Sequence, residues 1–133
     1  MNLDDLIVPL DRALRTLFAP AHSAREVPGE KLEDGATEDG ARRLAGALMR
    51  VNHTGEICAQ ALYEGQLLVV RDPDVRTLLT RAANEETEHL AWTERRIDEL
   101  AARKSLLNPL FYAGSFVLGA AAGLLGDRWS LGF

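Results

Sequence analysis

The chain has 133 residues, of which 47% are hydrophobic and 26% charged, and these values suit one folded domain better than a disordered segment. Its net charge of -5 gives no basic field to neutralise phosphates, which excludes nucleic acid as the main partner. A single cysteine, Cys58, excludes a disulfide framework and a thiolate metal cage within one chain.

Residues 1–18 form the first predicted element, because their apolar residues recur at helical spacing. Pro9 lies inside this pattern and predicts a kink or a late helix start. We favour a short amphipathic helix docked on a bundle, and the alternative is a helix on a membrane surface. The segment lacks the basic start and cleavage site of a secretory signal, so we expect the protein to stay where it is made.

Residues 19–36 are predicted to be a long polar linker, because prolines and glycines are interspersed with charged residues. Thr37 is the predicted N-cap of the long helix that follows. We expect the apolar stripe of this helix to face the core; its residues are Leu44, Leu48, Val51, Ala59, Leu62, Tyr63, Leu67 and Val70.

A second long helix is predicted to restart at Pro73, because proline directly after a capping Asp72 favours a helix start. We expect this helix to end near Arg103. A tight break between two long amphipathic helices indicates an antiparallel pair.

Residues 105–126 contain no charged side chain, and this length can support a membrane helix. Pro109 and several glycines interrupt the segment, so we favour an interfacial or shallowly inserted helix over one that crosses the membrane. A buried core helix is the alternative. Ser115, Gly119 and Gly123 form a small-residue stripe that is typical of close helix packing.

Polar residues interrupt the apolar faces of both long helices at Glu56, Glu86 and His89. At 1.5 Å per residue these positions lie about 24, 21 and 26 Å from the turn at Asp72, so they share one level of the hairpin. Buried carboxylates need a counter-charge, and Glu-x-x-His is a metal-binding motif of helical bundles. Oxygen-rich donors with one nitrogen suit iron, and we predict that these three residues are metal ligands.

Four neighbouring residues have alternative interpretations. Glu85 is a rival ligand, because its spacing from His89 is also compatible with metal binding. Glu88 is expected on a solvated face. His53 is interpreted as a histidine that supports the ligands rather than as a ligand itself. Tyr63 is interpreted as core packing, with a supporting role near the metal as the alternative.

Several segments of the sequence resemble the bacterial demethoxyubiquinone hydroxylase family. The strongest are residues 51–66 (VNHTGEICAQALYEGQ), 85–92 (EETEHLAW), 105–116 (SLLNPLFYAGSF) and 126–133 (GDRWSLGF). Residues 12–18 and 20–25 also resemble the family, so the likeness covers essentially the whole chain.

The resemblance implies an all-α, ferritin-like bundle and a di-iron monooxygenase that uses O2 to hydroxylate the ring of a prenylated demethoxyubiquinol in ubiquinone biosynthesis. By motif position, Glu56 would bind one iron, Glu86 would bridge both irons, and His89 would bind the first. The implied location is peripheral, on the cytoplasmic face of the bacterial inner membrane. Other ubiquinone-biosynthesis proteins are expected partners.

The ligand set departs from the family pattern, since the family has a second half with another Glu and another Glu-x-x-His. We therefore divide the chain into a helix at 1–18, a linker at 19–36 and the first half of a di-iron domain at 37–133. Three explanations stay open: an incomplete copy, which we favour; a homo-oligomer in which two chains complete one site; or a chain that binds no iron. The alternative functions are a non-catalytic, membrane-associated interaction protein and a self-assembling, ferritin-like iron binder.

Overall fold

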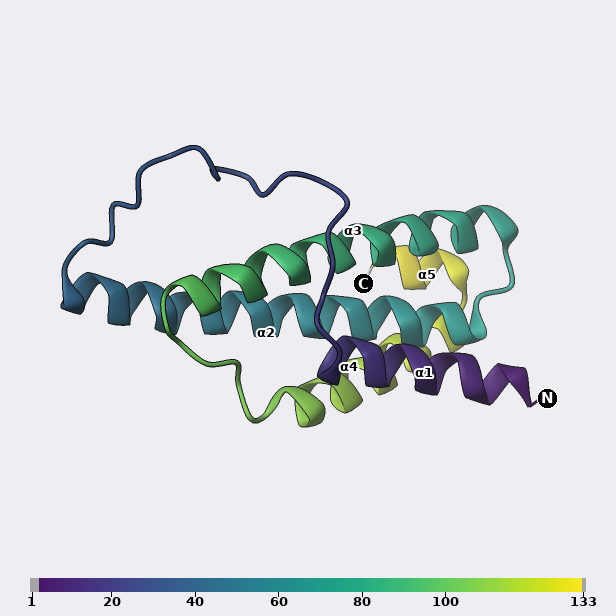
Figure 1. Ribbon diagram of the computed structural model, residues 1–133. Helices are drawn as coiled ribbons and strands as arrows, with labels where there is room; N and C mark the ends of the chain where they lie inside the picture. Colours follow the sequence, from purple (N-terminus) through teal and green to yellow (C-terminus); the bar gives the residue numbers. More distant parts are fainter. Residues whose placement is uncertain (1–2, 133) are drawn as a thin grey trace.

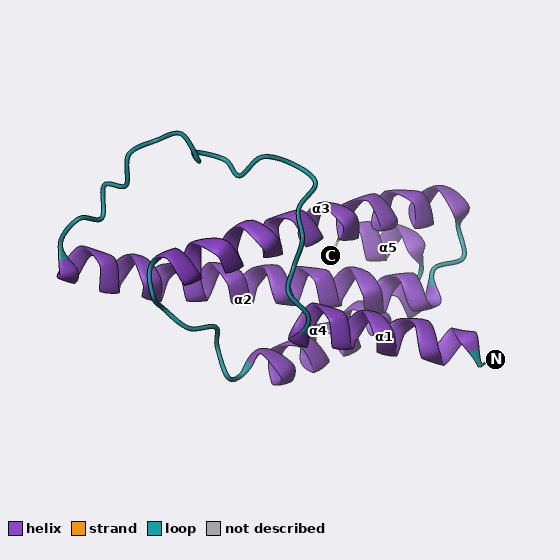
Figure 2. Ribbon diagram, in the orientation of Figure 1, coloured by secondary structure: helices purple, strands orange, loops and turns teal. Residues whose placement is uncertain are grey.

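The computed structural model describes residues 3–132 and folds them into helices joined by loops (Figure 1). The helices are α1 (Asp4–Phe18), α2 (Asp39–Val69), α3 (Pro73–Glu99), α4 (Asn108–Leu124) and α5 (Asp127–Leu131). Figure 2 shows only helices and loops across these residues, and the expected all-α helical bundle is confirmed. Residues 1–2 of the predicted helix at 1–18 lie outside the described residues, and so does residue 133 of the predicted half-domain at 37–133.

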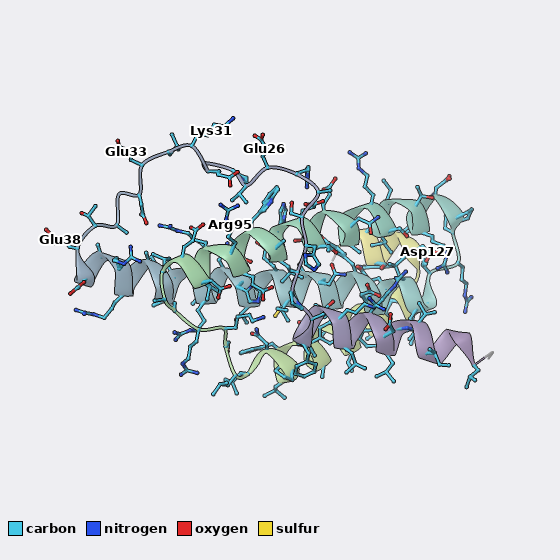
Figure 3. All side chains as sticks on the ribbon, viewed as in Figure 1. Glu26, Lys31, Glu33, Glu38, Arg95 and Asp127 are labelled. Carbon is cyan, nitrogen blue, oxygen red and sulfur yellow. The ribbon has the colours of Figure 1, made fainter. Side chains whose placement is uncertain are left out.

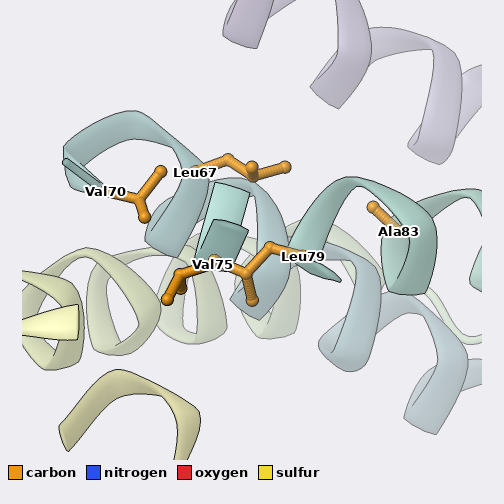
Figure 4. Packing of buried hydrophobic residues seen from close by; sticks show 5 residues of the cluster. All are labelled: Leu67, Val70, Val75, Leu79 and Ala83. Carbon is orange, nitrogen blue, oxygen red and sulfur yellow. The ribbon is translucent and has the colours of Figure 1, made fainter. Parts of the chain in front are cut away.

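The two long helices α2 and α3 form an antiparallel hairpin, as predicted (Figure 1). Asp72 caps α3 by accepting hydrogen bonds from the backbone amides of Asp74 at 2.8 Å and Val75 at 3.3 Å. Pro73 occupies the first turn, where a missing amide proton costs nothing. A cluster of buried residues closes this end of the hairpin (Figure 4): Leu67, Val70, Val75, Leu79 and Ala83.

Two predicted helix boundaries are wrong. Thr37 does not cap α2, because the helix begins at Asp39 and Glu38 occupies the N-cap position without a side-chain hydrogen bond. The second helix of the hairpin ends at Glu99 rather than near Arg103. The chain turns there through Ala101, whose φ of 51° lies in the left-handed region.

The first turns of α2 also differ from the prediction, since the apolar side chains there are not buried. Leu44, Leu48 and Val51 are 62%, 61% and 71% exposed. The reason is the position of α4, which begins beside Thr54, whose hydroxyl donates to the Asn108 side chain at 3.0 Å. No helix among residues 3–132 covers the stripe before that point.

Helix α4 packs against α2 through glycines, which confirms the prediction of close packing along the small-residue stripe. A Cβ atom on Gly119 would lie 2.1 Å from the Leu62 carbonyl oxygen, and one on Gly65 would lie 2.1 Å from the Phe116 carbonyl oxygen. The two backbones are therefore in direct contact. Within the described residues, no helix combines the length and the apolar character that a bilayer crossing requires.

Replacing Gly119 by alanine should lower the free energy of unfolding by about 3 kcal/mol, because the added methyl group forces two backbones apart. Gly114 is the matched control on the same helix, since a Cβ atom there meets nothing within 4 Å. Gly114→Ala should be neutral or stabilising by up to about 1 kcal/mol. Urea denaturation of both variants measures the difference, and equal midpoints would contradict this packing.

Helix α1 lies across α2 and α4 and is helical from Asp4 onward, so the predicted late start is wrong, while a kink at Pro9 stays a prediction. Ala13 and Leu17 pack against the buried cluster of α2, α3 and α4. The Arg12 guanidinium lies 3.2 Å from the carboxylate of Glu64, which is almost fully buried. The helix is thus docked on the bundle, as the favoured interpretation expects.

Residues 19–38 form a strap that crosses the outer side of α3 before it reaches the start of α2 (Figure 1). The Arg95 guanidinium, labelled in Figure 3, lies 2.7 Å from Glu30 of the strap. Arg96 lies 2.8 Å from Asp34. The strap also reaches Glu88 on this outer side of α3, where the Glu88 carboxylate accepts a hydrogen bond from the Ala24 amide at 3.3 Å.

The short helix α5 is tied to the turn of the hairpin. Gln66 donates from its side-chain amide to the Ser130 carbonyl at 2.7 Å. The carboxylate of Asp127, labelled in Figure 3, accepts from the Asp72 amide at 2.8 Å. These bonds place α5 beside the ends of α2 and α3, so residues far apart in sequence meet at one end of the bundle.

Candidate metal centre

Glu56 of α2 meets Glu86 and His89 of α3 at the predicted level of the hairpin. Each residue offers one ligand atom, and the three atoms all lie within 4.8 Å of one another. The His89 Nδ1 atom lies 3.1 Å from the Glu86 Oε2 atom and 3.7 Å from the Glu56 Oε2 atom. The predicted convergence of the three side chains is therefore confirmed.

The packing of the hairpin fixes this level. Ile57, next to Glu56, and Leu90, next to His89, are both buried in one hydrophobic cluster. Glu86 and His89 are one helical turn apart and therefore share a side of α3. Because the neighbours of two of these residues are buried in the core, the three polar side chains are held at the same level of the hairpin.

The Glu56 carboxyl is perturbed by its surroundings. Burial raises the pKa of Glu56 to about 7, with a further contribution from Glu86, and the nearby His89 imidazole acts in the opposite direction. Near neutral pH, the Glu56 carboxyl therefore holds a proton for part of the time, next to the Glu86 carboxylate. A metal cation relieves the same repulsion, and two carboxylates with one imidazole are donors that suit iron. The residues present thus fit a metal ion of this class.

Other residues considered from the sequence lie outside the cluster. Glu85 is exposed and pairs with Arg81 at 3.3 Å, so it does not join the three ligand atoms. His53 is buried, and its Nδ1 atom lies 2.9 Å from the Thr93 hydroxyl, which itself donates to the His89 carbonyl at 2.8 Å. Burial lowers the pKa of His53. His53 is therefore linked to the His89 backbone through the Thr93 hydroxyl, and its supporting role stays a prediction.

Tyr63 is half-buried and packs against the hydrophobic cluster at the turn. Burial raises the pKa of its hydroxyl, and the negative charges of Glu86, Glu56 and Glu85 raise it further. Core packing is therefore confirmed for the ring, while a role of the hydroxyl toward a metal stays a prediction.

A cavity of about 730 Å³ opens beside the cluster, between the strap and the hairpin. Glu56 and His89 lie on its wall. Residues 27–30 and 32–35 form the side opposite the helices. The other residues on the helical side are Met49, Asn52, Trp92, Thr93, Arg95, Arg96 and Glu99. Sequence reasoning missed this cavity, although Trp92 lies one turn after His89 in the motif at 85–92.

Comparison with known proteins gives a consistent family match. The sequence profile of the family described as ubiquinone biosynthesis protein COQ7 matches residues 43–133. The chain is 62% identical over 132 residues to a 3-demethoxyubiquinol 3-hydroxylase of Nitrosospira multiformis, covering 99% of this chain. Similarly named proteins of Nitrosomonas europaea and Dechloromonas aromatica are 59% and 62% identical and cover 100% of it. The chain spans 64% of the length of each of these relatives. No solved structure matches.

Proposed function

The chain belongs to the ubiquinone biosynthesis protein COQ7 family, and from this premise we propose that it hydroxylates the ring of a demethoxyubiquinol with O2 at an iron centre. The observation that carries the proposal is the meeting of Glu56, Glu86 and His89 at one level of the hairpin. The names of the relatives support the same chemistry, since those proteins are called 3-demethoxyubiquinol 3-hydroxylases.

In this proposal, Glu56 of α2 and Glu86 and His89 of α3 would together hold the iron, with Glu86 shared between the two ions of a complete site. Bound iron supplies the activation of O2, which side chains alone cannot provide. Glu56 is the group that must lose its proton when the metal binds, because its pKa lies near neutrality.

The cavity beside the ligands supports a site for the quinol ring. Glu56 and His89 lie on its wall, and Met49 and Trp92 supply apolar surface for a flat ring. The strap covers the opposite side. We propose that these walls orient the ring and limit the access of water to it.

Exposed apolar side chains support peripheral contact with a membrane surface. On α1 they are Ile7, Val8, Leu10, Leu14 and Phe18; on α4 they are Leu110, Phe111, Val117, Leu118 and Leu124. Such surface suits insertion into the headgroup region. We propose that these helices bring the protein to the cytoplasmic face of the inner membrane, where a prenyl tail reaches the site.

A di-iron site of the bundle type uses a Glu from each of two helices and a Glu-x-x-His from each of two others. The described residues supply one of each. Two copies related by a two-fold axis would also supply the full set, so a homo-oligomer is one arrangement compatible with the proposal. The exposed Leu48, one of the apolar residues on α2, supports an additional packing partner.

The test uses vesicles that contain a demethoxyubiquinol, together with iron(II), a chemical reductant and O2. The protein should float with the vesicles and convert the quinol to a product that is one oxygen atom heavier by mass spectrometry. Glu86→Ala should still float but form no product, whereas Glu85→Ala should retain conversion.

Two results would count against the proposal. Flotation with iron bound but the quinol unchanged would instead favour an interaction protein without chemistry. Oxidation of iron(II) at the same rate with and without quinol would favour a ferritin-like iron binder.

A further inference from the structure

Trp92 connects the candidate metal centre to the strap. Its ring packs against the His89 imidazole, with centroids 5.4 Å apart and planes at 44°. On the strap side, its indole Nε1 donates to the Ser23 hydroxyl at 3.0 Å, and the Arg25 guanidinium lies 5.1 Å above the ring centroid. Trp92 therefore contacts the strap on one side and the His89 imidazole on the other.

Ser23 fastens the strap to α3 at two points. Besides accepting from Trp92, its hydroxyl forms a hydrogen bond with the carboxylate of Glu88. That bond holds the pKa of the Glu88 carboxyl below its usual range. Glu88 and Trp92 are one turn apart on α3, and His89 lies between them in sequence. The strap is therefore anchored on the same helical turn that carries the histidine.

The imidazole needs such support, because it is less enclosed than its acidic partners. The His89 side chain is 39% exposed, against 20% for Glu56 and 14% for Glu86. Its contacts with the two carboxylates lie at Nδ1. A side chain that chooses among rotamers must lose that freedom when it binds an ion.

We infer that Ser23 and Arg25 are positioning residues that fix the His89 imidazole through Trp92. The inference rests on the proposed function in one respect, namely that His89 is a metal ligand. Trp92 limits the orientations of the imidazole from one side, and the strap limits the orientations of Trp92. Residues that orient a ligand in this way commonly affect metal affinity without touching the ion.

The strap offers a matched control at its other end. Asp34 is tied to Arg96 at 2.8 Å and to Arg42 at 3.8 Å. Neither arginine is part of the contact between Trp92 and His89. We call the contacts of Ser23 and Arg25 with Trp92 the brace. Asp34→Ala loosens the strap without touching the brace, whereas Ser23→Ala removes the hydrogen bond of the brace to Trp92. Ser23→Thr keeps a hydroxyl at the same place and should restore it.

The experiment has a metal-free arm and a metal-bound arm on the full chain. Without metal, NMR should show that the His89 ring protons shift in Ser23→Ala but stay near their wild-type positions in Asp34→Ala and Ser23→Thr. With Co²⁺ as the probe, Ser23→Ala should weaken binding by about 3- to 10-fold, below the effect typical of groups that bond a ligand directly. Asp34→Ala should change this affinity by less than about 2-fold.

Unchanged His89 signals in Ser23→Ala would overturn the inference, and so would an equal loss of Co²⁺ affinity in Ser23→Ala and Asp34→Ala. The proposed function fails separately. It fails if the wild-type protein binds no Co²⁺ while the His89 signals still differ between the wild type and Ser23→Ala. That result would support the contact chain from Ser23 to His89 and refute the metal centre.

Discussion

Glu86→Ala is expected to bind a divalent metal at least about 100-fold more weakly than the wild type, a larger loss than substitutions around a ligand produce. Glu86 is the least exposed of the three candidate ligands, and it lies 3.1 Å from His89. Its removal leaves one carboxylate and one imidazole, too few donors to hold an ion against water. The stability of the metal-free protein should instead rise, because the change also removes a charge that raises the pKa of Glu56.

Glu85→Ala is the matched control for this loss. The two residues are adjacent on α3, but Glu85 is exposed and pairs with Arg81. Its replacement should change metal affinity by less than about 2-fold, because exposed ion pairs contribute little. Competition against a fluorescent chelator measures both affinities. If the two variants bind equally well, Glu86 is not a ligand.

Metal affinity is also expected to depend steeply on pH below neutrality. Burial, assisted by Glu86, raises the pKa of Glu56 to about 7, so a proton competes with the metal for this carboxylate. Each unit of pH below about 7 should weaken binding about 10-fold for one displaced proton. Calorimetry in buffers with different ionisation enthalpies should detect the release of at least one proton per bound ion, and no proton release would contradict the assignment of Glu56.

The same shift has a definite sign for the stability of the metal-free protein. The ordinary pKa of Glu56 is 4.5, and the folded value is about 7, so the folded state binds the proton more tightly than the unfolded state. Its stability should therefore fall as pH rises from about 4.5 to about 7 and then level off. Glu56→Gln should flatten this dependence. Denaturation in the presence of a chelator provides the measurement.

The register of the candidate metal centre was predictable because a helix has a fixed rise. Asp72 as a helix cap and Pro73 in the first turn of α3 mark the turn, and the levels of the three candidate ligands follow from it by counting residues. The small-residue stripe on α4 was equally informative, since a glycine spacing of four predicts a close approach between helices.

The contacts of the strap were not predictable in the same way. Ser23 meets Trp92 across 69 positions of sequence, and nothing local distinguishes a linker that is solvated from one that is bonded to a helix. Periodicity also reveals which face of α2 is apolar but not what covers it. Leu44, Leu48 and Val51 follow the helical pattern, yet they remain exposed because α4 begins too late to reach them.

The most direct test of the metal centre is anomalous diffraction from crystals of the wild-type protein grown with Co²⁺. A peak within bonding distance of Glu56, Glu86 and His89 is the predicted result. A structure at full Co²⁺ occupancy elsewhere, with these three side chains bonded only to one another or to water, would contradict the account.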